Sequence, residues 1–249
     1  MPTSTWRNQL GESERLKIVQ KASECLWTVE GQDAFKYLKE ERGLSEATIR
    51  EFQIGFVPLR VSHQLSGRII TPIFDAYGEV VALSTRHLYK PKSEAFWHED
   101  FDKSFYLYGL HIAKKHILRT KKALIVEGEF DVSFMHSSDI PITVGLCGNS
   151  MSDFQVSLLA RYCKDIYLLY DGDGGGKMGL ERSGQAFKNV LAGGSRFGSL
   201  VNLIPVRLPK GMDPDDYVIE NSRNGLIKLM KSAKAEFDEW GYNGVSIKE

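Results

Sequence analysis

The chain has 249 residues, 42% of them hydrophobic, and its 32 basic and 32 acidic side chains give a formal net charge of zero. It is long enough to bury a core in one or two domains, and its overall charge does not mark it as a binder of polyanions. It contains no apolar stretch near the roughly 20 residues of a membrane span, and its polar N-terminus lacks the apolar core of a signal peptide. The three scattered cysteines form no C-x-x-C pair, which argues against a structural zinc site and favours a reducing cytosol.

The first part of the chain predicts short helices followed by a β-hairpin. Apolar residues at helical spacing run from Ser13 to Phe52, with a break at Gly43 and a good N-cap at Ser45. The period then becomes that of strands over 68–75 and 79–84, on either side of a glycine-containing turn. Residues 89–105 mix basic, aromatic and acidic side chains without a period, and we expect a long loop there.

From Lys121 onward the pattern alternates between strand and helix, which predicts a parallel sheet covered on both faces. Strands are expected near 123–127, 142–145, 166–170 and 200–206, and helices near 129–137, 152–161, 177–192, 214–220 and 224–240. Ser152 and Gln155 have the spacing of a capping box. The fold class is therefore α/β, with an N-terminal α+β lobe (1–118), a Rossmann-like lobe with a parallel sheet (119–220) and a C-terminal helical segment (221–249).

Carboxylates beside glycines follow two of the predicted strands, at the point where each strand ends. The first strand leads into Glu127-Gly-Glu-Phe-Asp131, and a later one leads into Asp171-Gly-Asp173. Because the carboxyl ends of neighbouring parallel strands converge on one crevice, we expect Glu127, Asp171 and Asp173 to gather at one edge. Clustered carboxylates repel one another unless a cation lies between them, and a hard divalent cation such as Mg²⁺ is the usual partner. The pattern points to chemistry on phosphates.

Each acidic group also has a purely structural explanation. Glu129 and Asp131 would complement the dipole of the helix that they begin, and the Asp/Gly run ending at Lys177 could be a flexible turn. That run is not a P-loop, because it lacks the early glycine and the Ser/Thr after the lysine. The carboxylates Asp213 and Asp215, on either side of Pro214, suit either a helix N-terminus or a third edge of a metal site.

Basic residues alternate with aromatic ones in the hairpin and in the segment after it. Cations can neutralise phosphates and aromatic rings can stack on bases, so this stretch is a candidate nucleic-acid interface. Ordinary surface charge over a small aromatic core is the alternative. The basic candidates are Arg68, Arg86, Lys90, Lys92 and Lys103.

Several motifs occur in a fixed order from about residue 35 to 220. Val126-Glu-Gly-Glu-Phe-Asp-Val132 resembles V-E-G-Y-M-D-V, Tyr170–Lys177 resembles Y-D-G-D-x-A-G-x, and Leu208–Asp215 resembles L-P-x-G-x-D-P-D. Upstream motifs of the same family, Y-L-x-x-R-G-L-S, F-x-I-G-Y, R-I-M-F-P-I and K-x-x-x-L-Y-G, are similar to Tyr37–Ser45, Phe52–Phe56, Arg68–Ile73 and Lys103–Gly109. The glutamate and the D-x-D resemble those of a TOPRIM domain, and the whole set resembles the DnaG-type primases of bacteria and phages.

The resemblance implies template-directed synthesis of short RNA primers on single-stranded DNA, from ribonucleoside triphosphates, by two-metal nucleotidyl transfer. Glu127, Asp171 and Asp173 would be the catalytic residues. Together with Asp131, Asp213 and Asp215 they would hold Mg²⁺ or Mn²⁺. The phosphates of nucleotide and DNA would be bound by Arg68, Arg86, Lys92, Lys103 and Lys177.

The chain departs from these primases in having no zinc-binding module before the polymerase core and only about thirty residues after Asp216. A separate zinc-binding module for template recognition and a replicative helicase are therefore expected as partners, with no membrane, in the cytoplasm of a bacterium or phage-infected cell. Two other classes stay open. The same carboxylates could serve a metal-dependent TOPRIM nuclease, or the chain could be a non-catalytic adaptor that binds DNA or helicase.

Overall fold

The computed structural model describes residues 10–61, 64–193 and 201–240, and the chain divides into two compact units. Unit 1 comprises Met1–Asp102 and unit 2 comprises Lys103–Glu249. The division falls before the predicted boundary at 118, because helix α5 (Leu110–Thr120) packs against strands β5 (Lys122–Val126) and β6 (Thr143–Gly145) of unit 2.

Unit 1 combines short helices with a four-stranded antiparallel sheet of order β1-β2-β3-β4. Its strands are β1 (Gly55–Val57), β2 (Arg68–Phe74), β3 (Val80–His87) and β4 (Phe96–His98). Its helices are α1 (Glu12–Cys25), α2 (Gln32–Lys36), α3 (Glu46–Glu51) and α4 (Lys92–Ala95), with a 3₁₀ turn at Val29–Gly31 and a π-helical turn at Tyr37–Glu41. The predicted N-cap is confirmed, since the Ser45 side chain accepts a hydrogen bond from the Thr48 amide.

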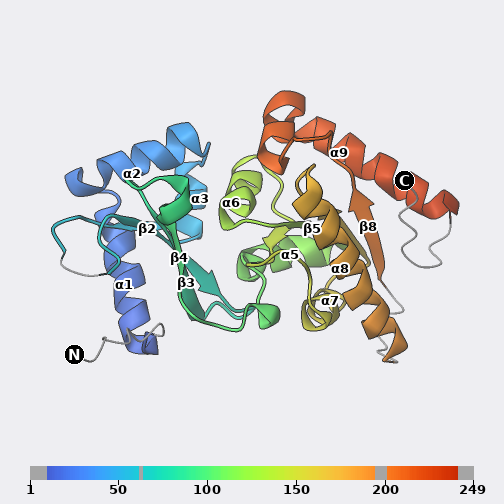
Figure 1. Ribbon diagram of the computed structural model, residues 1–249, viewed down its shortest axis with the longest axis horizontal. Helices are drawn as coiled ribbons and strands as arrows, with labels where there is room; N and C mark the ends of the chain where they lie inside the picture. The colour runs from blue at the N-terminus through green and yellow to red at the C-terminus, as the bar shows by residue number, and fades with distance from the viewer. Residues whose placement is uncertain (1–9, 62–63, 194–200, 241–249) are drawn as a thin grey trace. The chain divides into compact units, whose positions relative to one another are not determined.

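Helix α1 lies against the sheet of unit 1 (Figure 1) and closes its core. Val19 and Ala22 on the helix belong to one buried apolar cluster with Ile70 and Leu83 of the sheet. Gly55 is needed at the crossing, because a Cβ there would lie 2.3 Å from the Ala22 carbonyl carbon.

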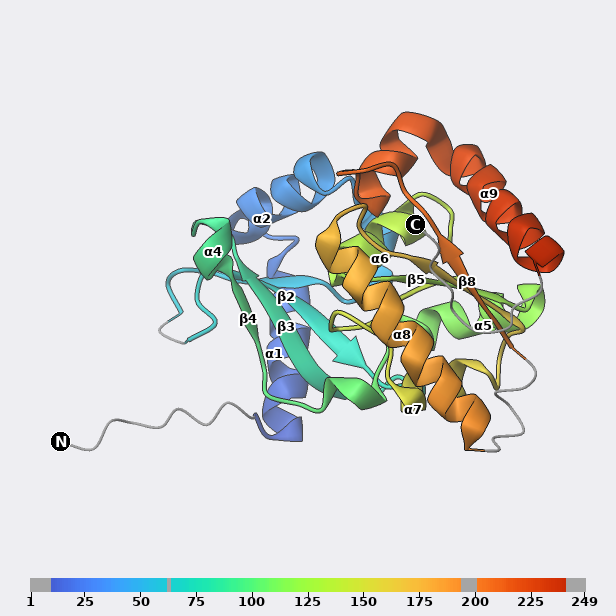
Figure 2. The same ribbon diagram turned by 45° about the vertical axis from the view of Figure 1, so that its right-hand side comes forward.

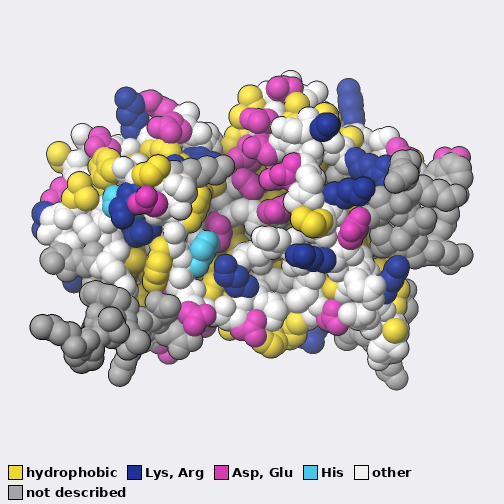
Figure 3. Space-filling model, in the orientation of Figure 1, with side chains coloured by type: hydrophobic (Ala, Val, Ile, Leu, Met, Phe, Trp, Pro, Cys, Tyr) yellow, Lys and Arg dark blue, Asp and Glu magenta, His cyan; other side chains and the backbone are white. Residues whose placement is uncertain are grey.

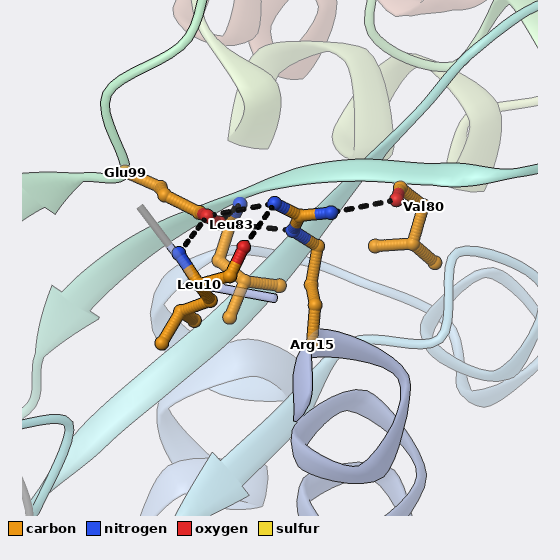
Figure 4. Close-up of polar contacts among 5 residues, drawn as sticks. All are labelled: Leu10, Arg15, Val80, Leu83 and Glu99. Carbon is orange, nitrogen blue, oxygen red and sulfur yellow. Dashed lines mark hydrogen bonds and ion pairs between the residues drawn. The ribbon is translucent and has the colours of Figure 1, made fainter. Parts of the chain in front are cut away.

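A buried ion pair fixes the start of α1 to β3 (Figure 4). The Glu99 carboxylate, in a residue only 2% exposed, accepts hydrogen bonds from the Arg15 guanidinium and from the amides of Leu10 and Leu83. Arg15 in turn donates to the carbonyl oxygens of Leu10 and Val80. A charge buried at this depth is tolerated because its oxygens are satisfied by several donors.

The predicted hairpin is confirmed, but the long loop expected at 89–105 is wrong in part. Strands β2 and β3 are joined by a turn in which Asp75 accepts from the amides of Tyr77 and Glu79. The segment after β3 contains α4 and then β4, which pairs with β3 through Thr85↔Trp97 and Arg86↔Phe96. A three-residue edge strand is too short to produce a detectable alternation, which also explains why β1 was missed.

Unit 2 is built on a parallel sheet of order β6-β5-β7-β8, and the predicted α/β class is confirmed. Its remaining strands and helices are β7 (Asp165–Leu169), β8 (Asn202–Val206), α6 (Glu129–Ser137), α7 (Asp153–Leu159), α8 (Gly174–Ala192) and α9 (Pro214–Trp240), with a 3₁₀ turn at Lys103–Phe105. Strand β6 lies on one side of β5, whereas β7 and β8 lie on the other. The connection from β5 through α6 to β6 therefore crosses the sheet in the direction opposite to the connections through α7 and α8. Right-handed crossovers therefore put α6 on one face of the sheet and α7 and α8 on the other. Figure 2 shows α8 lying across its face, and α9 packs against α6 and β8.

The boundaries in unit 2 follow the predictions closely, and the two helices expected after residue 213 are both present, as the two parts of α9 on either side of a kink. Helix α9 is interrupted at Ser222, where φ is 65° and ψ is 169°. That conformation is essentially restricted to glycine, so the kink is a strained point. Among the described residues, no helix is both long and apolar enough to cross a membrane.

Candidate active site

The predicted carboxylates lie at one edge of the parallel sheet of unit 2, because their strands are direct neighbours. Strands β5 and β7 pair in register through Leu124↔Tyr167 and Ile125↔Leu168. Glu127 comes immediately after β5, and Asp171 follows β7 by two residues. The convergence that the sequence predicted is therefore produced by the strand order.

Burial and neighbouring carboxylates both disfavour the charged form of Glu127. Its pKa is raised from 4.5 to about 7, first by burial and then by repulsion from Asp171, Asp173 and Asp131, although the Asp171 amide hydrogen-bonds to the carboxylate. One oxygen, Oε1, is buried and has no hydrogen-bond partner in the described part of the chain. A buried carboxylate that lacks a donor and faces other carboxylates is suited to a cation.

The Asp171-Gly-Asp173 loop is held by main-chain contacts. Asp173 is the N-cap of α8 and accepts a hydrogen bond of 2.9 Å from the Gly176 amide. The Gly172 amide donates to the Met212 carbonyl, and the Gly211 amide donates to the Gly172 carbonyl, both at 2.9 Å. Since a Cβ at Gly172 would lie 2.2 Å from the Pro209 carbonyl oxygen, the glycine lets the two loops meet.

A buried polar network supports this loop from beneath. The Tyr170 hydroxyl lies 2.8 Å from Ser183 Oγ, which also accepts from the Met151 amide at 2.9 Å. Burial raises the pKa of Tyr170, so the phenol stays neutral and keeps its proton for hydrogen bonding. The network joins the end of β7, helix α8 and the segment before α7.

Two of the three supporting carboxylates, Asp131 and Asp213, cap the starts of helices. Asp131 accepts from the Gly128 amide at 3.0 Å and caps α6, and Asp213 accepts from the Asp216 amide at 2.9 Å at the start of α9. Asp215, in the first turn of α9, is partly buried. Figure 3 shows acidic side chains gathered over α6 and the beginning of α9 in unit 2. For Asp131 and Asp213, the helix-capping explanation describes what the side chains do here.

The carboxylates do not form a ready-made ligand set. Within residues 10–61, 64–193 and 201–240, no group of three or more His, Cys, Asp or Glu side chains is arranged closely enough to hold a metal ion. Glu127, Asp171 and Asp173 therefore share one edge and interact through their charges, but their side chains are not drawn together as ligands around one point.

The basic candidates of unit 1 differ in the contacts that their side chains make. Arg68 donates to Thr85 Oγ1 and to the Ala95 carbonyl, and burial lowers its pKa, so it braces the sheet. The guanidinium of Arg86 lies 5.2 Å from the ring centroids of both Tyr37 and Phe96, and its buried Nε has no hydrogen-bond partner among the described residues. Lys92 begins α4, but its side chain lies outside what the structure describes.

The basic candidates of unit 2 are Lys103 and Lys177. Lys103 begins the 3₁₀ turn at Lys103–Phe105 and is half-buried, whereas Lys177 is exposed in the first turn of α8. Both are in the same unit as the carboxylates.

Sequence reasoning missed the residue that anchors the Lys103 segment. Gln155, 1% exposed, donates to the carbonyl oxygens of Lys103 and Tyr106, while Ser152 Oγ donates to the Ser104 carbonyl. The predicted capping box is confirmed, because Ser152 and Gln155 each accept from the other's amide. The spacing revealed the cap but not its second use, since the anchored carbonyls lie about fifty positions earlier in the chain.

Comparison with known proteins gives consistent results. Residues 124–218 match the family described as Toprim-like. The chain is 28% identical over 243 residues to a DNA primase of Aquifex aeolicus, covering 84% of this chain and 47% of that protein. It is 30% identical over 248 residues to a DNA primase of Synechocystis, covering 84% and 38%. The chain thus spans less than half the length of these relatives.

Solved structures share the fold. The Aquifex aeolicus primase structure with zinc-binding and RNA polymerase domains aligns with a TM-score of 0.73 at 25% identity, covering 90% of this chain and 62% of that one. A structure of the DnaG catalytic core aligns with a TM-score of 0.78 at 24% identity, covering 92% and 83%.

Proposed function

This chain is a homologue of the DnaG-type primases with the fold of their catalytic core and a TOPRIM domain, and on that premise we propose that it synthesises short RNA primers on single-stranded DNA. The reaction would join ribonucleotides as the 3′-hydroxyl of the growing primer attacks the α-phosphorus of an incoming ribonucleoside triphosphate and pyrophosphate leaves. It needs no nucleophile from the protein, so positioning and charge stabilisation are the protein's tasks.

The observation that carries the proposal is the Glu127 carboxylate at the edge that it shares with Asp171 and Asp173. Its raised pKa and its unpartnered Oε1 are the properties of a group that a divalent cation would stabilise. We propose that these three residues hold Mg²⁺ or Mn²⁺, with Asp131, Asp213 and Asp215 in support. A bound ion would act as a Lewis acid towards phosphate and hydroxyl oxygens.

The protein's own residues would then orient the substrates. Lys103 and Lys177 would neutralise phosphates, and Arg86 and Lys92 of unit 1 are proposed for the same task. Gln155 would keep the Lys103 main chain in place through its two carbonyl contacts. Arg68, whose guanidinium already donates within unit 1, is better assigned to the fold.

The test is a primer-synthesis assay on random single-stranded templates with labelled ribonucleotides and Mg²⁺. Glu127→Gln and Asp171→Asn should each lower synthesis by at least about 100-fold, because each removes a charge that the transition state requires. Asp165→Asn is the matched control, since it makes the same kind of change at the other end of β7, and it should keep near-normal activity. Normal synthesis by Asp171→Asn would refute the assignment.

Metal binding has a readout that does not depend on activity. A ligand that binds only the folded protein raises its stability with concentration, so Mg²⁺ or Mn²⁺ should raise the melting temperature of the wild type. The increase should disappear in Glu127→Gln and persist in Asp165→Asn. An equal increase in all three proteins would place the ion elsewhere.

The same preparation separates the other functions. A TOPRIM nuclease would digest DNA with the metal alone, whereas an adaptor would bind neither metal nor nucleotide. We further propose that a replicative helicase and a separate zinc-binding module complete the system, and that it works in the cytoplasm. Adding a replicative helicase to the assay should then increase primer yield.

A further inference from the structure

Unit 2 contains a pocket of about 310 Å³ at the end of its parallel sheet where strand β5 begins, opposite the end that carries Glu127. It lies between the C-terminal end of α5, the segment after α6 and the part of α9 that follows the kink. Strand β5 begins there with Lys122 and ends just before Glu127, so at about 3.3 Å per residue the pocket is about 17 Å from the carboxylates. It is a separate site.

The interior of the pocket is apolar. Ile140, Ile142, Ile227 and Met230 contribute aliphatic side chains, and Tyr167 contributes a ring. The volume falls at the lower end of the range for pockets that hold small ligands or a few side chains. Burying this apolar surface against another apolar group would be favourable, because it removes both from water.

The rim of the pocket is cationic. Arg119, Lys122 and Lys231 are exposed, and none has an ion-pair partner among the described residues. A fourth cation, Arg223, is already held by the carboxylate and carbonyl of Asp139. Three cations that make no ion pair among the described residues therefore line the rim of an apolar interior, in a chain whose formal net charge is zero.

Two simpler explanations do not account for this arrangement. Cations near a helix C-terminus complement its dipole, which explains Arg119 at the end of α5 but not Lys231 on α9. Sites for single-stranded nucleic acid combine cations with aromatic faces on which bases stack, and Tyr167, the pocket's ring, is 1% exposed. Phosphate binding alone would not require an aliphatic interior.

We propose that this pocket binds an acidic peptide segment of a partner protein, with one large apolar side chain of the peptide inserted among Ile140, Ile227 and Met230. The peptide's carboxylates would pair with Arg119, Lys122 and Lys231. Because the pocket lies at the sheet edge remote from Glu127, the partner could bind without blocking the carboxylates.

The test uses the full chain and a fluorescein-labelled peptide, Glu-Asp-Leu-Phe-Asp-Glu, followed by fluorescence polarisation. We expect saturable binding that weakens as salt is raised from 50 to 300 mM, on the order of tenfold. Two control peptides separate the contributions: Ser-Ser in place of Leu-Phe, and Gln/Asn in place of the acids. Both should bind at least about tenfold more weakly.

Matched variants locate the site. Lys231→Glu should weaken peptide binding by on the order of tenfold, whereas Lys228→Glu, the same charge reversal at an exposed residue of the same helix that does not line the pocket, should have little effect. Ile227→Ser should weaken binding without a change in charge. Circular dichroism and primer synthesis should be unchanged in all three variants.

Three outcomes would overturn the proposal. One is the absence of saturable binding, and another is equal binding of the control peptides. The third is an equal effect of Lys231→Glu and Lys228→Glu on peptide binding. Failure here leaves primer synthesis untouched, so it is distinguishable from failure of the proposed function.

Discussion

Replacement of Glu99 by alanine should be among the most destabilising single changes in unit 1. Glu99 is 2% exposed and joins the Arg15 guanidinium to the amides of Leu10 and Leu83. The substitution removes the acceptor for all of these donors at once. It leaves the Arg15 side chain, 13% exposed, without its counter-charge.

The loss in free energy of unfolding depends on how well the Arg15 guanidinium is compensated once Glu99 is removed. Removing one partner of a buried ion pair typically costs 3–5 kcal/mol, because the other charge is left uncompensated. Arg15 keeps its hydrogen bonds to the carbonyls of Leu10 and Val80, and its partial exposure admits water. We therefore expect the free energy of unfolding to fall by about 3 kcal/mol, the lower end of this range.

Urea unfolding followed by tryptophan fluorescence measures this change, because Trp27 and Trp97 both lie in unit 1. Glu40→Ala is the control, since it removes the exposed Lys36–Glu40 pair and should cause no measurable loss. A loss below about 1 kcal/mol in Glu99→Ala would mean that water replaces the carboxylate, and the reasoning from burial would be refuted.

Three further predictions concern unit 2. Glu127→Gln should stabilise the metal-free protein at pH 8 but not at pH 4. The pKa of Glu127 is about 7 in the folded state and 4.5 in the unfolded state, so the stability of the wild type falls as the pH rises between these two values. Thermal unfolding at several pH values measures this difference. Gly172→Ala should abolish primer synthesis, because its Cβ would meet the Pro209 carbonyl at 2.2 Å, whereas Gly174→Ala, with open space around its Cβ, should stay active. Ser222→Gly should stabilise the protein by about 1 kcal/mol in urea unfolding, since glycine adopts the conformation at the kink without strain, and a loss of stability would contradict the strain.

The sequence predicted the parallel sheet well because each of its strands is a buried apolar run with a clear end. The run before Glu127 and the run before Asp171 became neighbouring strands, and their carboxylates share an edge, as strand order requires. Helix α6 spans the predicted residues 129–137, and glycine followed by acidic residues marks its start.

Parts of the fold that depend on tertiary pairing could not be predicted. Strand β4 exists because Phe96, Trp97 and His98 pair with β3, and three residues carry no period of their own. The support that Gln155 gives to Lys103 and Tyr106 is equally invisible, because it joins segments distant in the sequence. Likewise, the D-x-D spacing revealed the candidate ligands but not that Asp173 caps α8.

The contact between Gly172 and the loop at 209–212 uses main-chain atoms on both sides, so it places no demand on the side chain of Lys210. Lys210 is exposed and directly precedes Gly211, whose amide donates the hydrogen bond to Gly172. A cysteine introduced there could carry a fluorescent dye beside the acidic edge while the loop pairing remains intact. The same chain would then report nucleotide arrival optically, in real time, without any change to the carboxylates.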